Sequence, residues 1–191
     1  MGEAERARAA LEAAADLHRR VAADGVDAIV RAAGMMKAAF EAGGQLLAFG
    51  NGGSATDAEH FVAELVGRFR RERRGLPAVA LTTDAAVLTS VANDYGYDAV
   101  FARQVEALGR RGDVAIGVTT SGASANVNAA LERARAMGLA TVGLTGRDGG
   151  VTGTLVDVHV NVADDDTARI QEVHRTILHV WCELIEDAVR T

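Results

Sequence analysis

Apolar and polar positions along this chain of 191 residues alternate between two patterns. Short runs of apolar, β-favouring residues end at glycine, serine or asparagine, and longer stretches with helical spacing lie between them. The first pattern predicts strands over residues 45–49, 78–82, 113–118, 140–144 and 156–161. The second predicts an N-terminal helical region over 3–42, interrupted near Asp24-Gly25, and helices over 54–69, 84–92, 98–109, 123–137 and 166–190.

Strands that alternate with helices favour one fold class. Such a pattern is typical of an α/β protein with a doubly wound parallel sheet, here of about five strands, flanked by helices. We see no break in composition and no internal repeat, so we expect a single domain over residues 1–191. Residues 1–43 would form an N-terminal helical region, and residues 44–191 an α/β core closed by a long C-terminal helix.

Composition and charge exclude several classes of protein. No apolar run reaches about 18 residues, so we expect no membrane span. The charged N-terminus and the lone Cys182 favour a reducing cytoplasm. A net charge of −6 argues against broad nucleic-acid binding. The arginine-rich stretch 68–74 is typical of a solvated loop. The alternative is that Arg68 contacts a phosphate or a partner.

Polar segments follow three of the predicted elements, where a doubly wound sheet binds its ligands. Asn51, Gly52, Gly53 and Ser54 come after the first strand and open a helix, which makes a ready anion site. Asn93 and Asp94 form a second candidate loop. The third segment holds four hydroxyl groups around a glycine, those of Thr119, Thr120, Ser121 and Ser124.

The four hydroxyls of the third segment favour phosphate binding. Hydroxyls and N–H groups at a helix N-terminus can hold a phosphate without a lysine, because the helix dipole supplies positive potential. The alternative is an ordinary N-cap, which would account for only one hydroxyl.

His60 and Glu64 share one face of the predicted helix 54–69, four residues apart. They could share a metal ion or a proton-transfer task, or they could be a simple surface pair. Gln171, His174 and His179 lie in the otherwise apolar last helix. Taken alone, a buried imidazole is more often a hydrogen-bonded core residue than a ligand.

Five segments carry a resemblance to a known family. The run Gly50-Asn51-Gly52-Gly53-Ser54, followed by His60, Glu64-Leu65 and Gly67-Arg68, resembles the first signature of the phosphoheptose isomerases of the sugar-isomerase (SIS) family. The later signatures are matched in order by Val91-Ala92-Asn93-Asp94-Tyr95-Gly96, Ser121-Gly122-Ala123-Ser124-Ala125-Asn126-Val127, Leu144-Thr145-Gly146 and Arg169-Ile170-Gln171-Glu172-Val173-His174. Two departures are Ala123, where Asn is usual, and Thr119, where Ser is usual.

The resemblance implies an enzyme of heptose biosynthesis. It would convert sedoheptulose 7-phosphate to D-glycero-D-manno-heptose 7-phosphate or its C2 epimer, often with bound zinc and as a homotetramer. By resemblance, the metal ligands are His60, Glu64, Gln171 and His179. The substrate contacts are Asn51, Gly52, Gly53, Ser54, Glu64, Asn93, Asp94, Thr119, Thr120, Ser121, Ser124 and Gln171.

For the chemistry, we assign Glu64 as the base that moves a proton between C1 and C2, and His179 as its acid–base partner. Zinc would polarise the carbonyl, and Glu64 could coordinate it only weakly while acting as a base. Gln171 and His179 are eight residues apart, or about 12 Å along a helix at ~1.5 Å per residue. We therefore expect one of them to reach the site from a neighbouring subunit, with the terminal helices forming the oligomer contacts.

Two other functions remain open from the sequence. One is a non-catalytic SIS protein, either a sugar-phosphate sensor or an assembly factor for replication initiation. Such a protein need not keep His60, Glu64, Gln171 and His179 together. The other is an SIS enzyme acting on aminosugar phosphates, which would require different acid–base residues.

Overall fold

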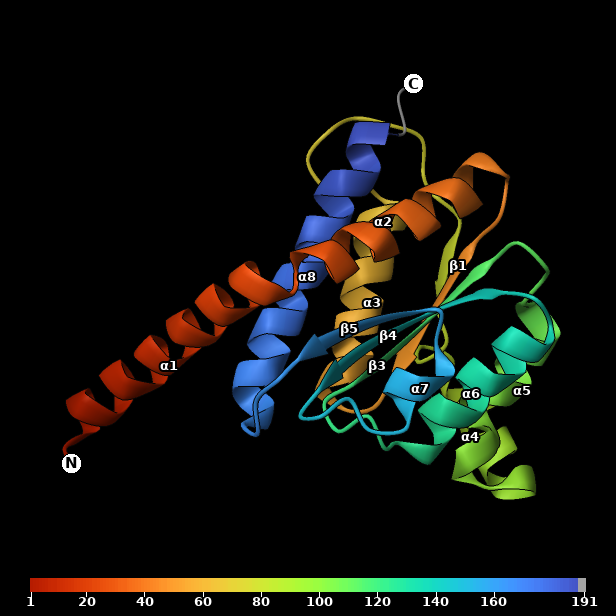
Figure 1. The fold of residues 1–191 in the computed structure, drawn as a ribbon. Helices are drawn as coiled ribbons and strands as arrows, with labels where there is room; N and C mark the ends of the chain where they lie inside the picture. Colours follow the sequence, from red (N-terminus) through yellow and green to blue (C-terminus); the bar gives the residue numbers. More distant parts are fainter. Residues whose placement is uncertain (189–191) are drawn as a thin grey trace.

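The structure is a computed structural model that describes residues 1–188, and it has helices on both faces of one parallel sheet (Figure 1). The strand order is β2-β1-β3-β4-β5. The strands are β1 (Leu46–Gly50), β2 (Ala78–Ala80), β3 (Val114–Thr119), β4 (Ala140–Gly146) and β5 (Val158–Val162). The helices are α1 (Glu3–Asp24), α2 (Val26–Glu41), α3 (Gly53–Val66), α4 (Ala85–Tyr95), the 3₁₀ turn η1 (Tyr97–Ala99), α5 (Val100–Leu108), α6 (Ala125–Ala136), α7 (Thr152–Leu155) and α8 (Thr167–Ala188). The predicted α/β fold class is confirmed.

Alternate residues of the central strands β1 and β3 enter two separate hydrophobic clusters. Ala48 and Ile116 pack with α2, α3 and α8 on one face of the sheet. Leu47, Phe49 and Ala115 pack with α5 and α6 on the other face. Both faces of β1 and β3 are therefore buried, which explains why their sequences read as continuous apolar runs.

The direction of chain winding changes at β1. From β1 the chain passes to β2 on one side of the sheet, and then to β3 on the other side. The helix after β1 lies in the first hydrophobic cluster, whereas the helix after β3 lies in the second. The loops after β1 and β3 diverge at this point, which is where open α/β sheets bind ligands.

Two helix ends and one short helix differ from the prediction. Asn93 and Asp94 lie in the last turn of α4, because the helix continues to Tyr95 and ends at Gly96, whose φ is 87°. The helix predicted over 54–69 ends at Val66. The short helix α7 was not predicted, and residues 189–190 of the predicted last helix lie outside the described residues.

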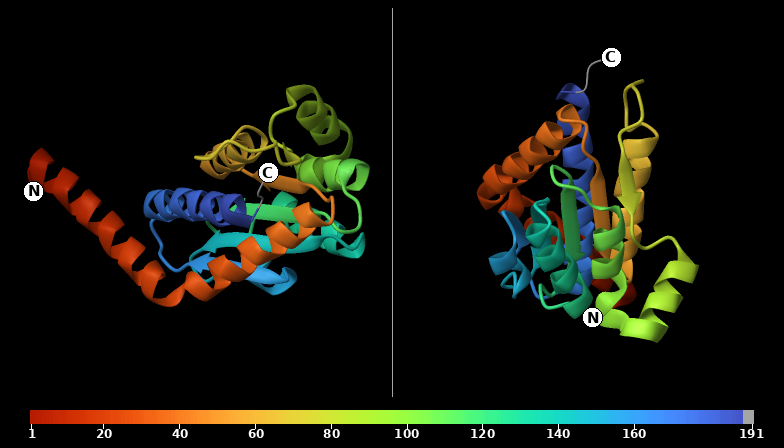
Figure 2. Two further views of the ribbon diagram at one scale, coloured as in Figure 1. Left: turned by 90° about the horizontal axis from the view of Figure 1, so that it is seen from above. Right: turned by 90° about the vertical axis from the view of Figure 1, so that its right-hand side faces the viewer.

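Helix α1 projects beyond the sheet, and most of its length is exposed (Figure 2). Leu17 is its one buried residue, while Leu11 is 72% exposed. The predicted interruption of the N-terminal helical region is confirmed, because Gly25 separates α1 from α2. No helix among residues 1–188 is long and apolar enough to cross a membrane.

Candidate functional site

Two imidazoles and a carboxylate meet between α3 and α8. Nε2 of His60 lies 2.8 Å from Nε2 of His179, and the two rings meet edge to face at 66°. Oε1 of Glu64 lies 3.6 Å from Nε2 of His60. Since the two nitrogens face each other, one donates a proton and the other accepts it. The structure thus brings together three of the four predicted metal ligands within one chain.

An ion pair with a buried carboxylate lies one helical turn away from the histidine pair. Nε and Nη2 of Arg175 on α8 lie 2.7 Å and 2.5 Å from Oδ1 of Asp57 on α3. Asp57 is 4% exposed, and burial raises the pKa of its carboxyl against the opposing effect of Arg175. Burial, and then Arg175, lower the pKa of His60, while Glu64 opposes them. The His60 imidazole is therefore biased toward the neutral form, which can bind a metal or accept a proton.

Sequence reasoning gave Asp57 and Arg175 no role. The signal that could have found them is their spacing. Asp57 precedes His60 by one turn on α3, and Arg175 precedes His179 by one turn on α8, so the two pairs form successive contacts between the same helices.

Gln171 lies apart from the three convergent side chains. Its amide packs against Gly53 at the first turn of α3, where a methyl group added to the glycine would come within 2.5 Å of Nε2. Because α8 is one continuous helix, Gln171 and His179 are separated by about 12 Å along its axis. The fourth predicted ligand is thus not placed beside the other three in this chain.

The hydroxyl groups after β3 form their own cluster. Oγ1 of Thr119 lies 3.0 Å from Oγ of Ser124 and 3.3 Å from Oγ of Ser121. Thr120, the next residue in the sequence, is half-buried. Ser124 is the N-cap residue of α6, yet its hydroxyl makes no capping bond. Gly122, with φ of 64°, allows the chain to pass close to the carbonyl of residue 149. The N-cap alternative therefore does not account for the Ser124 hydroxyl.

The remaining predicted substrate contacts lie around the loop after β1. The amides of Asn51 and Asn126 exchange two hydrogen bonds of 2.9 Å, and the Tyr97 hydroxyl donates to Asn51 at 3.1 Å. Gly52 and Gly53 are exposed, whereas Ser54 is buried. At the end of α4, Asn93 and Asp94 are exposed and hydrogen-bonded to each other.

His60 and Glu64 lie well along α3 from the loop after β1. This helix begins at Gly53, at the edge of the sheet where the strands end, and runs away from that edge. At ~1.5 Å per residue, His60 lies about 10 Å and Glu64 about 16 Å along the helix from Gly53.

The donor set between α3 and α8 fits a zinc ion chemically. Two imidazole nitrogens and a carboxylate oxygen are ligands that zinc accepts. In residues 1–188, no group of three or more His, Cys, Asp or Glu side chains is arranged as a ready metal site. The direct contact between Nε2 of His60 and Nε2 of His179 shows nevertheless that both nitrogens point to one position.

Comparisons with known proteins identify the family of this chain. The model of the SIS domain family matches residues 11–146. The phosphoheptose isomerase of Geobacter metallireducens is 60% identical over 81% of this chain and 82% of its own length. That of Roseiflexus sp. is 56% identical over 92% of this chain and 89% of its own.

A solved structure shows the same arrangement of elements. The phosphoheptose isomerase of Neisseria gonorrhoeae is 43% identical and superposes with a TM-score of 0.93, covering 97% of this chain and 100% of that one. The chain therefore belongs to the SIS domain family and, within it, to the phosphoheptose isomerases, which are aldose–ketose isomerases.

Proposed function

We propose that this isomerase interconverts sedoheptulose 7-phosphate and D-glycero-D-manno-heptose 7-phosphate, or its C2 epimer, through an enediol. The names of the relatives support a heptose phosphate as the substrate class. The observation that carries the proposed chemistry is the convergence of Glu64, His60 and His179 between α3 and α8.

The proposed mechanism divides the proton transfers between two groups. Glu64 takes the proton from C1 of the ketose and returns it to C2, which a carboxylate base can do. His179 moves a proton between O1 and O2, a task that an imidazole can perform. Zinc bound by His60, His179 and Gln171, with Glu64 as a weak ligand, would supply Lewis-acid polarisation of the carbonyl.

The hydroxyl cluster is the proposed phosphate site. Thr119, Ser121 and Ser124 gather their hydroxyls at the N-terminus of α6, where the helix dipole favours an anion. Thr120 and the loop after β1 would contact the sugar. The Asn51 side chain already exchanges hydrogen bonds with Asn126. Its contact with the sugar would use the second N–H of its amide group.

A second copy of the chain would complete the site. The separation of Gln171 from His179 along α8, and of the loop after β1 from Glu64 along α3, supports a site shared between copies in a homotetramer. An apolar groove of about 460 Å³ between α1, α2 and α8 offers a contact surface. Val26 and Val30 on its rim are 48% and 52% exposed.

Substitution of Glu64 by Gln tests the proposed function. Since a positioned general base contributes about 10²- to 10⁴-fold, Glu64→Gln should lower kcat by at least about 100-fold while binding of the sugar phosphate is largely kept. Glu59→Gln changes another carboxylate of α3 and should leave turnover near normal. Near-normal turnover in Glu64→Gln would contradict the assignment.

A further inference from the structure

The arginine loop, residues 67–77 between α3 and β2, is tied to the end of α8. Figure 1 shows this yellow segment passing over the C-terminal end of α8. Sequence reasoning favoured a solvated loop, and this expectation is wrong for Arg73, whose side chain is only 3% exposed. Arg68 remains exposed and pairs with Glu72 at 3.7 Å.

One buried carboxylate organises the arginine loop. The side chain of Glu186 on α8 is 4% exposed. Its oxygens accept hydrogen bonds from the backbone N–H groups of Phe69 at 2.9 Å, Arg70 at 3.0 Å and Arg71 at 3.2 Å. They also accept one from Nε of Arg73 at 3.2 Å. Because three consecutive N–H groups bind one carboxylate, the backbone of the loop is fixed at Phe69.

Arg73 holds the end of the helix that carries Glu64. Its guanidinium donates to the backbone carbonyl of Glu64 at 2.8 Å and to that of Leu65 at 2.9 Å. These carbonyls belong to the last turn of α3, where the helix itself provides no N–H partners. A buried cation there satisfies them and complements the helix dipole.

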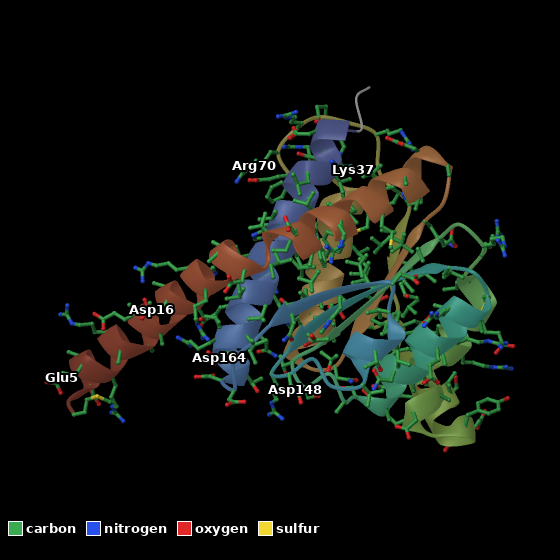
Figure 3. The ribbon with its side chains drawn as sticks, in the orientation of Figure 1. Glu5, Asp16, Lys37, Arg70, Asp148 and Asp164 are labelled. Atoms are coloured by element: carbon green, nitrogen blue, oxygen red, sulfur yellow. The ribbon has the colours of Figure 1, made fainter. Side chains whose placement is uncertain are left out.

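Phe69 packs on the other proposed acid–base residue. Its ring lies 5.5 Å from that of His179, with 28° between the ring planes. The guanidinium of Arg70 lies 5.0 Å from the centre of the Phe69 ring. Figure 3 shows Arg70 beside the C-terminal part of α8, where Arg70 also pairs with Glu183. The Phe69 ring is thus supported by both the backbone and the side chain of its neighbour.

We propose that the arginine loop is a positioning element for the acid–base pair. Glu186 fixes Arg73 and Phe69, Arg73 holds the turn of α3 that carries Glu64, and Phe69 holds the ring of His179. One buried carboxylate therefore sets the placement of both groups. This inference rests on the proposed function for the roles of Glu64 and His179.

Substitution of Phe69 distinguishes two roles of the arginine loop, stabilisation of the fold and positioning of the acid–base pair. Phe69→Leu keeps apolar volume but removes the flat ring face beside His179. We expect kcat for sedoheptulose 7-phosphate to fall about tenfold, since small displacements of reacting groups reduce rates steeply, with KM changed by less than about twofold. Phe69→Tyr restores the ring and should return kcat to within about twofold of the original.

A control and a structural readout accompany these variants. Val66→Ala removes an exposed apolar side chain at the end of α3 and should leave kcat unchanged. In the metal-free protein, the ring protons of His179 should shift downfield in NMR spectra of Phe69→Leu, because the neighbouring aromatic ring is lost. Unchanged kcat in Phe69→Leu, no rescue by Phe69→Tyr, or unchanged His179 shifts would overturn the proposal.

The Glu64→Gln variant separates this inference from the proposed function. If Glu64→Gln is inactive while Phe69→Leu is fully active, the positioning role fails and the assignment of Glu64 stands. If Glu64→Gln is active, the assignment of the base fails, whatever Phe69→Leu does.

Discussion

His60 shows how burial and a neighbouring charge can keep an imidazole neutral. The Nε2 atoms of His60 and His179 lie 2.8 Å apart, and burial and Arg175 lower the pKa of His60. The counterion of Arg175, Asp57, is buried and has one carboxylate oxygen without a hydrogen-bond partner. The ion pair and the histidine pair therefore depend on the same packing of α3 against α8.

Loss of the Asp57 charge should weaken this packing. Asp57→Asn leaves Arg175 without its counterion, and we expect a loss of about 2 kcal/mol in the free energy of unfolding. This is less than for a fully buried pair, because Arg175 is partly exposed. Urea denaturation measures the effect. Asp16→Asn, in an exposed pair with Arg19, should change the free energy of unfolding by less than about 0.5 kcal/mol. Equal losses in the two variants would contradict a special role for the Asp57 charge.

The buried His174 predicts sensitivity to mild acid. Burial lowers its pKa to about 4 from 6.5, although Nε2 hydrogen-bonds to the carbonyl of Thr145. Between these two values the unfolded chain takes up a proton that the folded chain does not, so stability falls as the pH is lowered from 6.5 toward 4. Urea midpoints across this range should decline in the parent protein and decline less in His174→Asn. Parallel declines in both proteins would contradict this cause.

Among the elements, the sequence-based predictions succeeded where the pattern is local. Apolar runs and glycine-ended turns located the sheet, and the helical spacing of His60 and Glu64 placed them on one face of α3. The burial of Arg73 was not predictable, because it depends on Glu186, which is distant in the sequence. The distance of about 12 Å between Gln171 and His179 was predictable from their spacing on one helix. The contact of Gln171 with Gly53 was not, since it depends on how α8 lies along α3.

The hydrogen bonds between Glu186 and the arginine loop should stabilise the fold less in acid. Burial alone would raise the pKa of Glu186, but the N–H groups of the loop and Arg73 outweigh it and hold the pKa below its usual value of 4.5. The resulting stabilisation is present above that value and is lost as the pH falls through the lower folded value.

The variant Glu186→Gln tests this contribution. It leaves Arg73 buried without a counterion, so we expect about 3 kcal/mol lower stability at neutral pH. The difference from the parent protein should shrink as the pH falls below 4.5, because the parent also loses the charge. Urea denaturation across this pH range would show the convergence, and a difference independent of pH would exclude the charge as its source.

In the whole molecule, activity should depend on assembly if copies share the site. Val30→Glu places a charge on the rim of the apolar groove between α1, α2 and α8, and should give a smaller species with at least about tenfold lower turnover. Arg111→Glu, an exposed change beyond α5, should affect neither property. Light scattering and turnover on the same samples provide the measurement, and a fully active monomer would refute the shared site.

The most direct test of the account is incubation of the purified protein with sedoheptulose 7-phosphate, with and without zinc, followed by NMR. We predict signals of an aldoheptose 7-phosphate for the parent protein, at a rate that zinc increases, and none for Glu64→Gln. The absence of any aldose signal under both metal conditions would contradict the proposed substrate and reaction.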